Sequence, residues 1–215
     1  MKYITTATVI SQQKAYKNGI CLFADEDGAL PAFLIAAYRH FGFNYPRFYK
    51  MDNLAKLGWL ASEILLQGSL ESGRYQPEEV GIVFSNASSS LDADLKYFES
   101  ARDIASPSLF VYTLPNIVIG EICIKHKFKG ESAFFIFESF NADFLEKYVS
   151  GLFNSNILQA CICGWVECIE NEYKAALFLV ETDMNELKDR QASAWDSVPL
   201  FTKDNLNKIY HLSNG

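Results

Sequence analysis

The sequence lacks any long apolar run and any excess of basic residues. No stretch approaches the ~18 uninterrupted apolar residues that cross a bilayer, and the start, MKYITTATVISQQKAYKNG, has no apolar core of signal-peptide length. We therefore expect no membrane span and a cytoplasmic protein. The 19 Lys and Arg are outnumbered by 26 Asp and Glu, giving a formal charge of −7, so a general nucleic-acid-coating role is not expected.

The cysteines fit neither a disulfide framework nor a common zinc site. There are five, an odd number, in a chain with no evident export signal, which favours reduced thiols. The spacing of Cys161, Cys163 and Cys168 matches no common zinc motif. In an extended strand, Cys161 and Cys163 fall on one face as small core residues. We predict buried thiols, no metal and no cofactor.

The composition is that of one globular domain with a layered fold. Of the 215 residues, 49% are hydrophobic and 21% charged, and this length suits a single domain over residues 1–215. Short apolar runs bounded by turn residues alternate with segments of helical spacing, which predicts an α/β fold with a mixed five-stranded sheet and helices on both faces. The predicted strands are residues 3–10, 80–85, 133–138, 158–166 and 175–181. The near-continuous apolarity of AFFIF predicts a central strand.

Four helices are predicted from apolar stripes and start signals. The first covers residues 52–66. The second begins after residues 88–90, where Ser89 and Asp92 have capping spacing. The third covers residues 116–126, with Pro115 in its first turn. The fourth begins near Phe140, where an apolar stripe starts.

Ser139 follows a predicted buried strand and precedes the fourth helix. Such a junction suits a nucleophile, because helix-start amides stabilise developing negative charge. The neighbours of Ser139 include none of the glycines of the G-x-S-x-G elbow. On local sequence alone, a serine that caps the helix is the commoner interpretation.

Residues 107–167 resemble the amino-terminal half of a β-ketoacyl-acyl carrier protein synthase of the thiolase superfamily. The family's L-P-N leader is matched at residues 114–116, its turn before the next strand at 128–132, and its last strand at 163–167. Residues 49–52 and 88–92 also look familial. The resemblance implies half of a thiolase-like fold over residues 1–215, in which residues 183–215 form a divergent tail in place of the second half.

Two departures from the family shape the functional expectation. The position of the nucleophilic Cys holds Ser139, whose hydroxyl is almost un-ionised at neutral pH without a base. The family's two catalytic histidines lie in a second half, and His40, His126 and His211 match neither of them. The chain thus resembles the chain-length factors, non-catalytic partners of active ketosynthases, and in particular the half-length subunits of aryl-polyene and flexirubin-type pathways.

The resemblance also implies partners and site residues. The partner is an active ketosynthase in a heterodimer, or a second copy in a homodimer, and acyl carrier protein binds indirectly. In the family, the strand matching residues 132–138, which holds Phe135 and Phe137, pairs with its counterpart across the two-fold axis. The loop matching residues 106–113 reaches toward the partner's acyl tunnel. Leu109, Phe110 and Tyr112 are therefore candidates to shape its end, with plain packing an equal alternative.

Two alternatives stay open, and the tail carries a structural expectation. The first is an enzyme that uses Ser139 as acyl acceptor, such as a thioesterase or acyltransferase with Glu138 or Asp143 nearby. The second is a stand-alone acyl-binding homodimer. In the tail, we expect a short helix over residues 183–190. We expect four apolar residues to pack back on the sheet: Trp195, Val198, Leu200 and Phe201.

Overall fold

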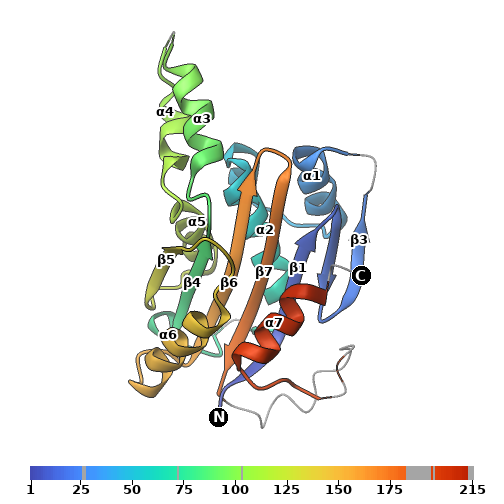
Figure 1. The fold of residues 1–215 in the computed structure, drawn as a ribbon, viewed down its shortest axis with the longest axis vertical. Helices are drawn as coiled ribbons and strands as arrows, with labels where there is room; N and C mark the ends of the chain where they lie inside the picture. The colour runs from blue at the N-terminus through green and yellow to red at the C-terminus, as the bar shows by residue number, and fades with distance from the viewer. Residues whose placement is uncertain (26–27, 72, 103, 183–194, 196, 213–215) are drawn as a thin grey trace.

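The computed structural model describes residues 1–25, 28–71, 73–102, 104–182, 195 and 197–212. They form one sheet with helices on both of its faces (Figure 1). The strands are β1 (Tyr3–Ser11), β2 (Lys14–Lys17), β3 (Ile20–Ala24), β4 (Val80–Asn86), β5 (Ser132–Ile136), β6 (Ala160–Ile169) and β7 (Glu172–Glu181). The α-helices are α1 (Leu30–His40), α2 (Asn53–Leu66), α3 (Leu91–Ser100), α4 (Pro107–Phe110), α5 (Ile117–His126), α6 (Ala142–Asn154) and α7 (Lys203–His211), with 3-10 turns η1 (Pro46–Lys50), η2 (Pro77–Glu79) and η3 (Val111–Thr113).

The sheet has seven strands in the order β3-β2-β1-β7-β6-β4-β5, so the predicted count of five is wrong. All five predicted strands exist, and β4 lies parallel to both β5 and β6, while the other pairs are antiparallel. The two missed strands, β2 and β3, form a short hairpin. The sequence of β2, KAYK, is half lysine and carries no apolar run from which a strand can be recognised.

Helices α1, α2 and α5 cover one face of the sheet, and α6 and α7 cover the other (Figure 1). The largest fully buried side chain, Trp59, belongs to α2, a helix that lies very close to its neighbour α5. A methyl group added at Gly58 of α2 would lie 2.6 Å from Cγ2 of Val118 in α5. The glycine therefore sets how near α2 and α5 lie, and next to it Trp59 is completely buried.

One helix start agrees with the sequence and two differ. The helix predicted from residue 52 is α2, and the Asp52 carboxylate caps it by accepting a hydrogen bond from the Ala55 amide at 2.9 Å. The predicted cap at Ser89 is wrong, because Ser89 has a φ of 52° and Ser90 is the N-cap residue of α3. Pro115 precedes the first turn of α5 rather than lying in it.

The tail returns to the second face of the sheet, as predicted for two of its residues. Phe201 is buried, and Trp195 packs against the same apolar cluster. The Ile4 amide donates to the Pro199 carbonyl at 2.8 Å, which ties the tail to β1. The side chain of Leu200 is exposed, so its predicted packing is wrong. Val198 is half-buried, and the helix expected over residues 183–190 lies outside the described residues.

Candidate functional site

Strand β5 is an edge strand, which contradicts the prediction that AFFIF lies in the centre of the sheet. It pairs only with β4, and none of its residues is fully buried. Glu131 accepts a hydrogen bond from Ile82 and Phe137 donates to Asn86. Because alternate residues of a strand bond to opposite sides, the amides and carbonyls of residues 132, 134 and 136 face away from the sheet.

The two faces of β5 are covered to different degrees. On the α6 side, Phe135 lies with its ring 4.8 Å from that of Phe144 and 5.0 Å from that of Tyr148, and Phe137 lies 4.8 Å from Phe144. These aromatic rings are half-buried. Beside the other face lies an open groove between β5 and α5, lined by Pro115, Asn116, Ile119, Gly120, Cys123, Ser132, Ala133 and Phe134. Apolar surface therefore continues past the edge of the sheet on both sides.

Helices α3 and α4 form a hairpin that extends beyond the sheet (Figure 1). Its apolar side chains face solvent instead of a core. Phe98 is 62% exposed and Phe110 is 59% exposed, and the Phe110 ring lies 5.4 Å from that of Tyr97. We call this set the hairpin surface: Leu91, Leu95, Phe98, Ile104, Phe110, Val111 and Leu114. Contiguous exposed apolar surface of this kind marks an interaction site.

The three loop residues predicted to reach a partner lie at different depths. Phe110 belongs to the hairpin surface, and Leu109 is half-buried. Tyr112 is buried, and burial, with the nearby Glu121 carboxylate, raises the pKa of its hydroxyl to about 12. Tyr112 therefore lies under the hairpin and belongs to its support.

Buried polar groups hold the base of the hairpin. Asp92 bonds Lys96 at 2.6 Å and accepts a hydrogen bond from the Glu170 amide at 3.2 Å. The Ser90 hydroxyl donates to the Thr113 carbonyl at 2.8 Å, which joins the two ends of the hairpin. Sequence reasoning missed this cluster, and the acidic first turn of α3 was its only signal.

A second buried carboxylate lies close to the hairpin. Glu121 of α5 accepts a hydrogen bond from the Tyr45 hydroxyl at 3.0 Å and from Arg47 at 2.8 Å. The coulombic effect of Glu121 raises the pKa of Arg47, while burial raises that of Tyr45. All three groups have partners, so the arrangement is structural and offers no free acid or base.

Ser139 lies at the junction between β5 and α6, as predicted, but it does not cap the helix. Asn141 is the N-cap residue, and its side chain accepts a hydrogen bond from the Phe144 amide at 3.0 Å. Ser139 is exposed in a shallow depression lined by residues 137–143 and Asn207. The interpretation of Ser139 as a capping serine is therefore wrong, since the cap comes two residues later.

The groups around Ser139 include carboxylates but no histidine. Glu138 and Asp143 line the same depression. Asp143 bonds Lys147 at 2.6 Å, and this hydrogen bond lowers the pKa of the Asp143 carboxyl, which makes it a weaker base. Of the three histidines, His126 is hydrogen-bonded to Glu63. Among the described residues that line this depression, the carboxylates of Glu138 and Asp143 are the candidate bases, and none is a histidine.

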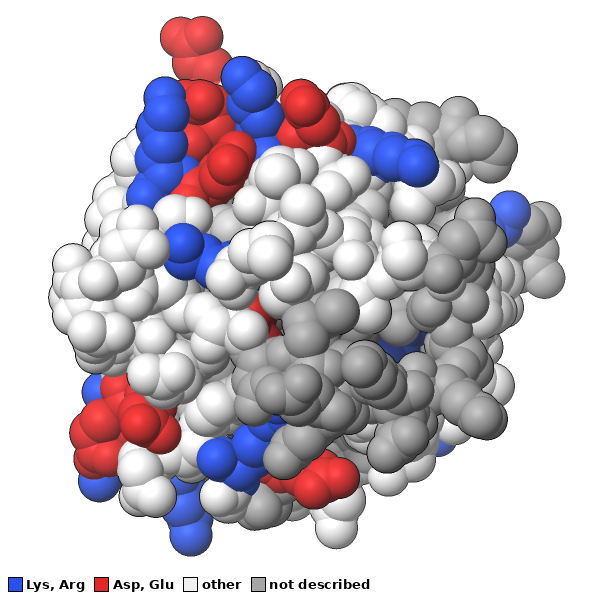
Figure 2. Space-filling view, turned by 90° about the horizontal axis from the view of Figure 1, so that it is seen from below, with Lys and Arg blue, Asp and Glu red and all other residues white. Residues whose placement is uncertain are grey.

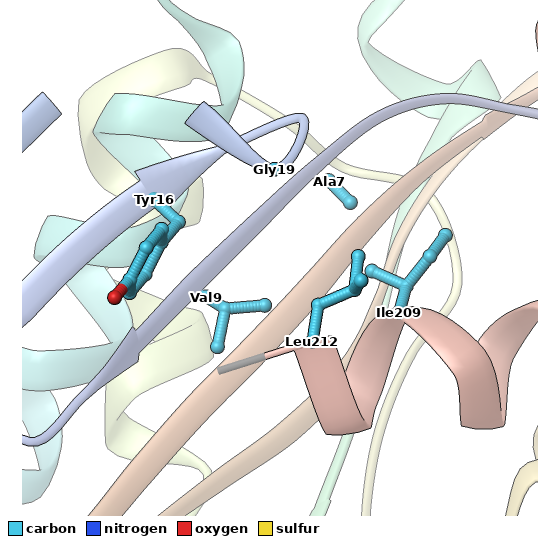
Figure 3. A pocket seen from close by; sticks show the side chains of 6 residues that line it. All are labelled: Ala7, Val9, Tyr16, Gly19, Ile209 and Leu212. Carbon is cyan, nitrogen blue, oxygen red and sulfur yellow. The ribbon is translucent and has the colours of Figure 1, made fainter. Parts of the chain in front are cut away.

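The buried cysteines and a small hollow beside α7 offer no catalytic group to the Ser139 depression. The cysteines Cys161, Cys163 and Cys168 are buried as predicted, and burial raises the pKa of Cys163 and Cys168. Among the described residues no group of His, Cys, Asp and Glu side chains is arranged to hold a metal ion. A small hollow lies between α7 and the β1–β2 hairpin, where the sticks in Figure 3 show apolar side chains and the Tyr16 hydroxyl.

The charge on the lower face is mixed. Figure 2 shows blue and red residues interspersed around the periphery of this face, with mostly uncharged residues between them. In the part of the chain that the structure describes, no single helix is long and apolar enough to cross a membrane, whereas the bent pair Pro107–Thr113 and Ile117–His126 meets the length and composition test together.

The arrangement of sheet and helices matches solved ketosynthase structures. One chain of "The ishigamide ketosynthase/chain length factor" superimposes with a TM-score of 0.58 at 18% identity, over 92% of this chain and 64% of that one. The fold is thiolase-like. A chain of a type II polyketide acyl carrier protein–ketosynthase complex, AntDE:AntF, gives a TM-score of 0.61 at 14% identity, over 87% of this chain and 64% of that one.

A third thiolase-like match is close to this chain in length. It comes from a ketosynthase, ApeO, in complex with its chain length factor, ApeC, from Xenorhabdus doucetiae, with a TM-score of 0.54 at 12% identity over 97% of this chain and 90% of that one. By contrast, this chain spans 64% of the length of each of the first two matches. No protein-family model matches the sequence, and no curated protein is similar to it. The predicted thiolase-like α/β fold is confirmed.

Proposed function

We propose that the chain is a non-catalytic, chain-length-factor-like subunit that pairs with an active ketosynthase in the synthesis of a fatty-acid-like, polyketide or aryl-polyene chain. The observation that carries the proposal is that both the free edge of β5 and the hairpin surface present exposed apolar side chains. A monomer gains nothing from exposing them, and an unpaired edge strand invites pairing with another strand. The thiolase-like fold supports a ketosynthase as the partner, and acyl carrier protein then docks through that partner.

The surroundings of Ser139 support the non-catalytic part of the proposal. In the family that the sequence resembles, a second half supplies the catalytic histidines. In this chain, α7 lies beside α6 on that face of the sheet, and the Tyr210 ring stacks on the Phe140 ring at 4.3 Å. The chain's own α7 therefore packs against the residue that follows Ser139, while Ser139 itself stays exposed in its depression. The role is organisational: the subunit stabilises the active partner and limits the length of its acyl chain.

Replacing Phe110 by Ala tests the limit on chain length. Phe110 is exposed, so the substitution leaves the fold intact, whereas Tyr112→Ala would remove a buried ring. In a reconstituted pair with the ketosynthase, we expect Phe110→Ala to shift the products to longer chains, read by mass spectrometry. Leu212→Ala, an exposed position outside the hairpin, is the control. An unchanged product distribution for Phe110→Ala would remove this role.

The alternative enzyme needs a covalent acyl-Ser139, and the exposure of Ser139 makes it accessible. Incubation of the chain with an acyl thioester, followed by intact-mass measurement, separates the two functions. The proposal predicts no adduct and no thioester turnover, with wild type and Ser139→Ala each keeping the mass of its unmodified chain. An adduct or turnover that disappears in Ser139→Ala would establish the enzyme instead.

A further inference from the structure

A cleft lies at the amino ends of the parallel strands β4 and β5, whereas Ser139 and the hairpin follow their carboxyl ends. It is formed by the segment between α2 and β4, the start of β4, and the last residue of α5 with the two residues that follow it. Its volume of about 330 Å³ lies in the range of sites that hold small molecules. Six of its lining residues define its walls: Leu70, Tyr75, Val80, His126, Lys127 and Phe128.

A histidine on the wall of this cleft is held by a carboxylate. Nε2 of His126 is hydrogen-bonded to Oε1 of Glu63, and the side chain of Glu63 is only 9% exposed. Because an ionised carboxylate only accepts hydrogen bonds, Nε2 carries the proton and Nδ1 of the neutral ring is an acceptor. Within the described ranges Nδ1 has no hydrogen-bond partner. His126 therefore has one acceptor left for a ligand in the cleft that it lines.

Flat apolar surface accompanies this acceptor. The Phe128 ring lies within 15° of parallel to the His126 ring, with the ring centroids 5.2 Å apart. Tyr75 contributes a third ring, and its hydroxyl donates to the fully buried Glu181 carboxylate at 2.9 Å. Burial, together with the charge of Glu181, raises the pKa of the Tyr75 hydroxyl, so it remains a donor and the ring keeps its position. Walls of this kind fit a planar aromatic ring.

The charges on the walls of the cleft balance. Glu71 and Lys127 both line it and contribute one charge of each sign. Apart from His126, the other described lining residues are uncharged. The cleft thus favours neither an anion nor a cation, and a neutral ligand fits it better than an ion does.

We propose that this cleft binds a neutral, planar heteroaromatic molecule that donates one N–H or O–H hydrogen bond to Nδ1 of His126. The aromatic walls hold the ring of the ligand, and the carboxylate of Glu63 keeps the proton of His126 on the other nitrogen. The site does not depend on the pairing with a ketosynthase, since it lies at the opposite end of β4 and β5 from the hairpin.

Indole and benzofuran separate the hydrogen bond from the apolar contact, because the two bicyclic molecules have nearly the same shape and only indole has an N–H donor. Titration of the isotope-labelled wild-type chain with each compound, followed by the NMR shifts of its backbone amides, gives the two dissociation constants. We expect indole to shift the amides of residues 126–128 and to bind about tenfold more tightly than benzofuran. Equal affinities, or indole shifts confined to other parts of the chain, would overturn the proposal.

The variant His126→Phe keeps a flat ring and removes the acceptor. We expect its affinity for indole to fall about tenfold and its affinity for benzofuran to stay the same, so that the preference for indole disappears. The matched control is His40→Phe, because His40 also contacts aromatic rings but lies outside the cleft, and it should keep the wild-type preference. A preference for indole that persists in His126→Phe would contradict the proposal. The comparison of the two ligands on the wild-type chain decides the matter even where a variant fails to fold.

Discussion

At the scale of single residues, three carboxylates that are buried or half-buried lie under the hairpin. Asp52, Asp92 and Glu121 are all held by hydrogen bonds from backbone or cationic groups. Such groups fix the position of the elements that carry them, because a buried charge without its partner is costly. These three carboxylates thus hold the elements at the base of the hairpin in place.

The pH dependence of stability should report Asp52. Burial raises the pKa of its carboxyl from 3.8 to about 6, and the Asp92 carboxylate acts in the same direction. Because the pKa is higher in the folded chain, the folded state holds a proton that the unfolded state releases. This stabilisation is complete below pH 3.8 and is lost as the pH rises to about 6.

Asp52→Asn keeps an acceptor for the Ala55 amide but removes the charge. From pH 4 to pH 7, we expect the free energy of unfolding of the wild type to fall by about 1–2 kcal/mol relative to Asp52→Asn, as measured by urea unfolding. Asp143→Asn is the control. Because the hydrogen bond from Lys147 lowers the pKa of Asp143, the free energy of unfolding of the wild type should rise, relative to Asp143→Asn, over the same pH range. If the difference in free energy of unfolding between wild type and Asp52→Asn does not change with pH, the pKa of Asp52 is not raised in the folded chain.

At the scale of helices and strands, close approach of α2 and α5 fixes the layer that supports the hairpin. Helix α5 continues from η3 and leads into β5, so its position also determines where the edge of the sheet lies. Gly58 permits this approach, and its neighbour Val118 is buried. The close contact at Gly58 therefore helps to fix the position of α5, which connects the hairpin to the edge strand β5.

Two glycine variants separate this packing from helix propensity. Gly58→Ala should lower the free energy of unfolding by about 1–3 kcal/mol, because the added methyl group overlaps Val118. Gly151→Ala, in a helix with open space around it, should raise it by about 0.5–1 kcal/mol. Both are measured by chemical denaturation. A stabilising Gly58→Ala would mean that α2 and α5 are able to separate at no cost.

The sequence predicted which residues form helices and strands where the apolar pattern was long. It predicted poorly where each strand lies in the sheet. Helix α2 was predicted within one residue of its true start, because its fourteen residues carry a long periodic apolar pattern. The order of strands is not encoded in any one strand, so the apolar β5 was placed in the centre, where most strands of that composition lie. The family resemblance, which implied pairing of residues 132–138 across a two-fold axis, agreed better with an edge position than the composition did.

The candidate site was partly predictable for the same reason. Ser139 was located because the end of a strand and the start of a helix are both visible in the sequence. The capping role of Asn141 was missed because two side chains with cap propensity lie close together, and only the backbone path decides between them. Phe110 and Tyr112 are two residues apart, and the sequence alone does not show that one is exposed and the other buried.

At the scale of the whole molecule, α6, α7 and the tail cover one face of the sheet, whereas the edge strand β5 has no neighbouring strand on its outer side among the described residues. The tail and α7 cover the face beside α6, with Phe201, Leu206 and Ile209 buried there. The edge of β5 and the hairpin surface have no cover within the described residues. This asymmetry fits a subunit whose contact with another chain is lateral, through the edge of its sheet.

The proposed role as the non-catalytic partner of a ketosynthase is tested by native mass spectrometry of the complex purified under mild conditions from cells that make it, with each subunit identified by its peptides. We expect a one-to-one heterodimer whose second subunit is a ketosynthase with a nucleophilic cysteine. A complex that contains only this chain and acquires an acyl group at Ser139 would contradict it.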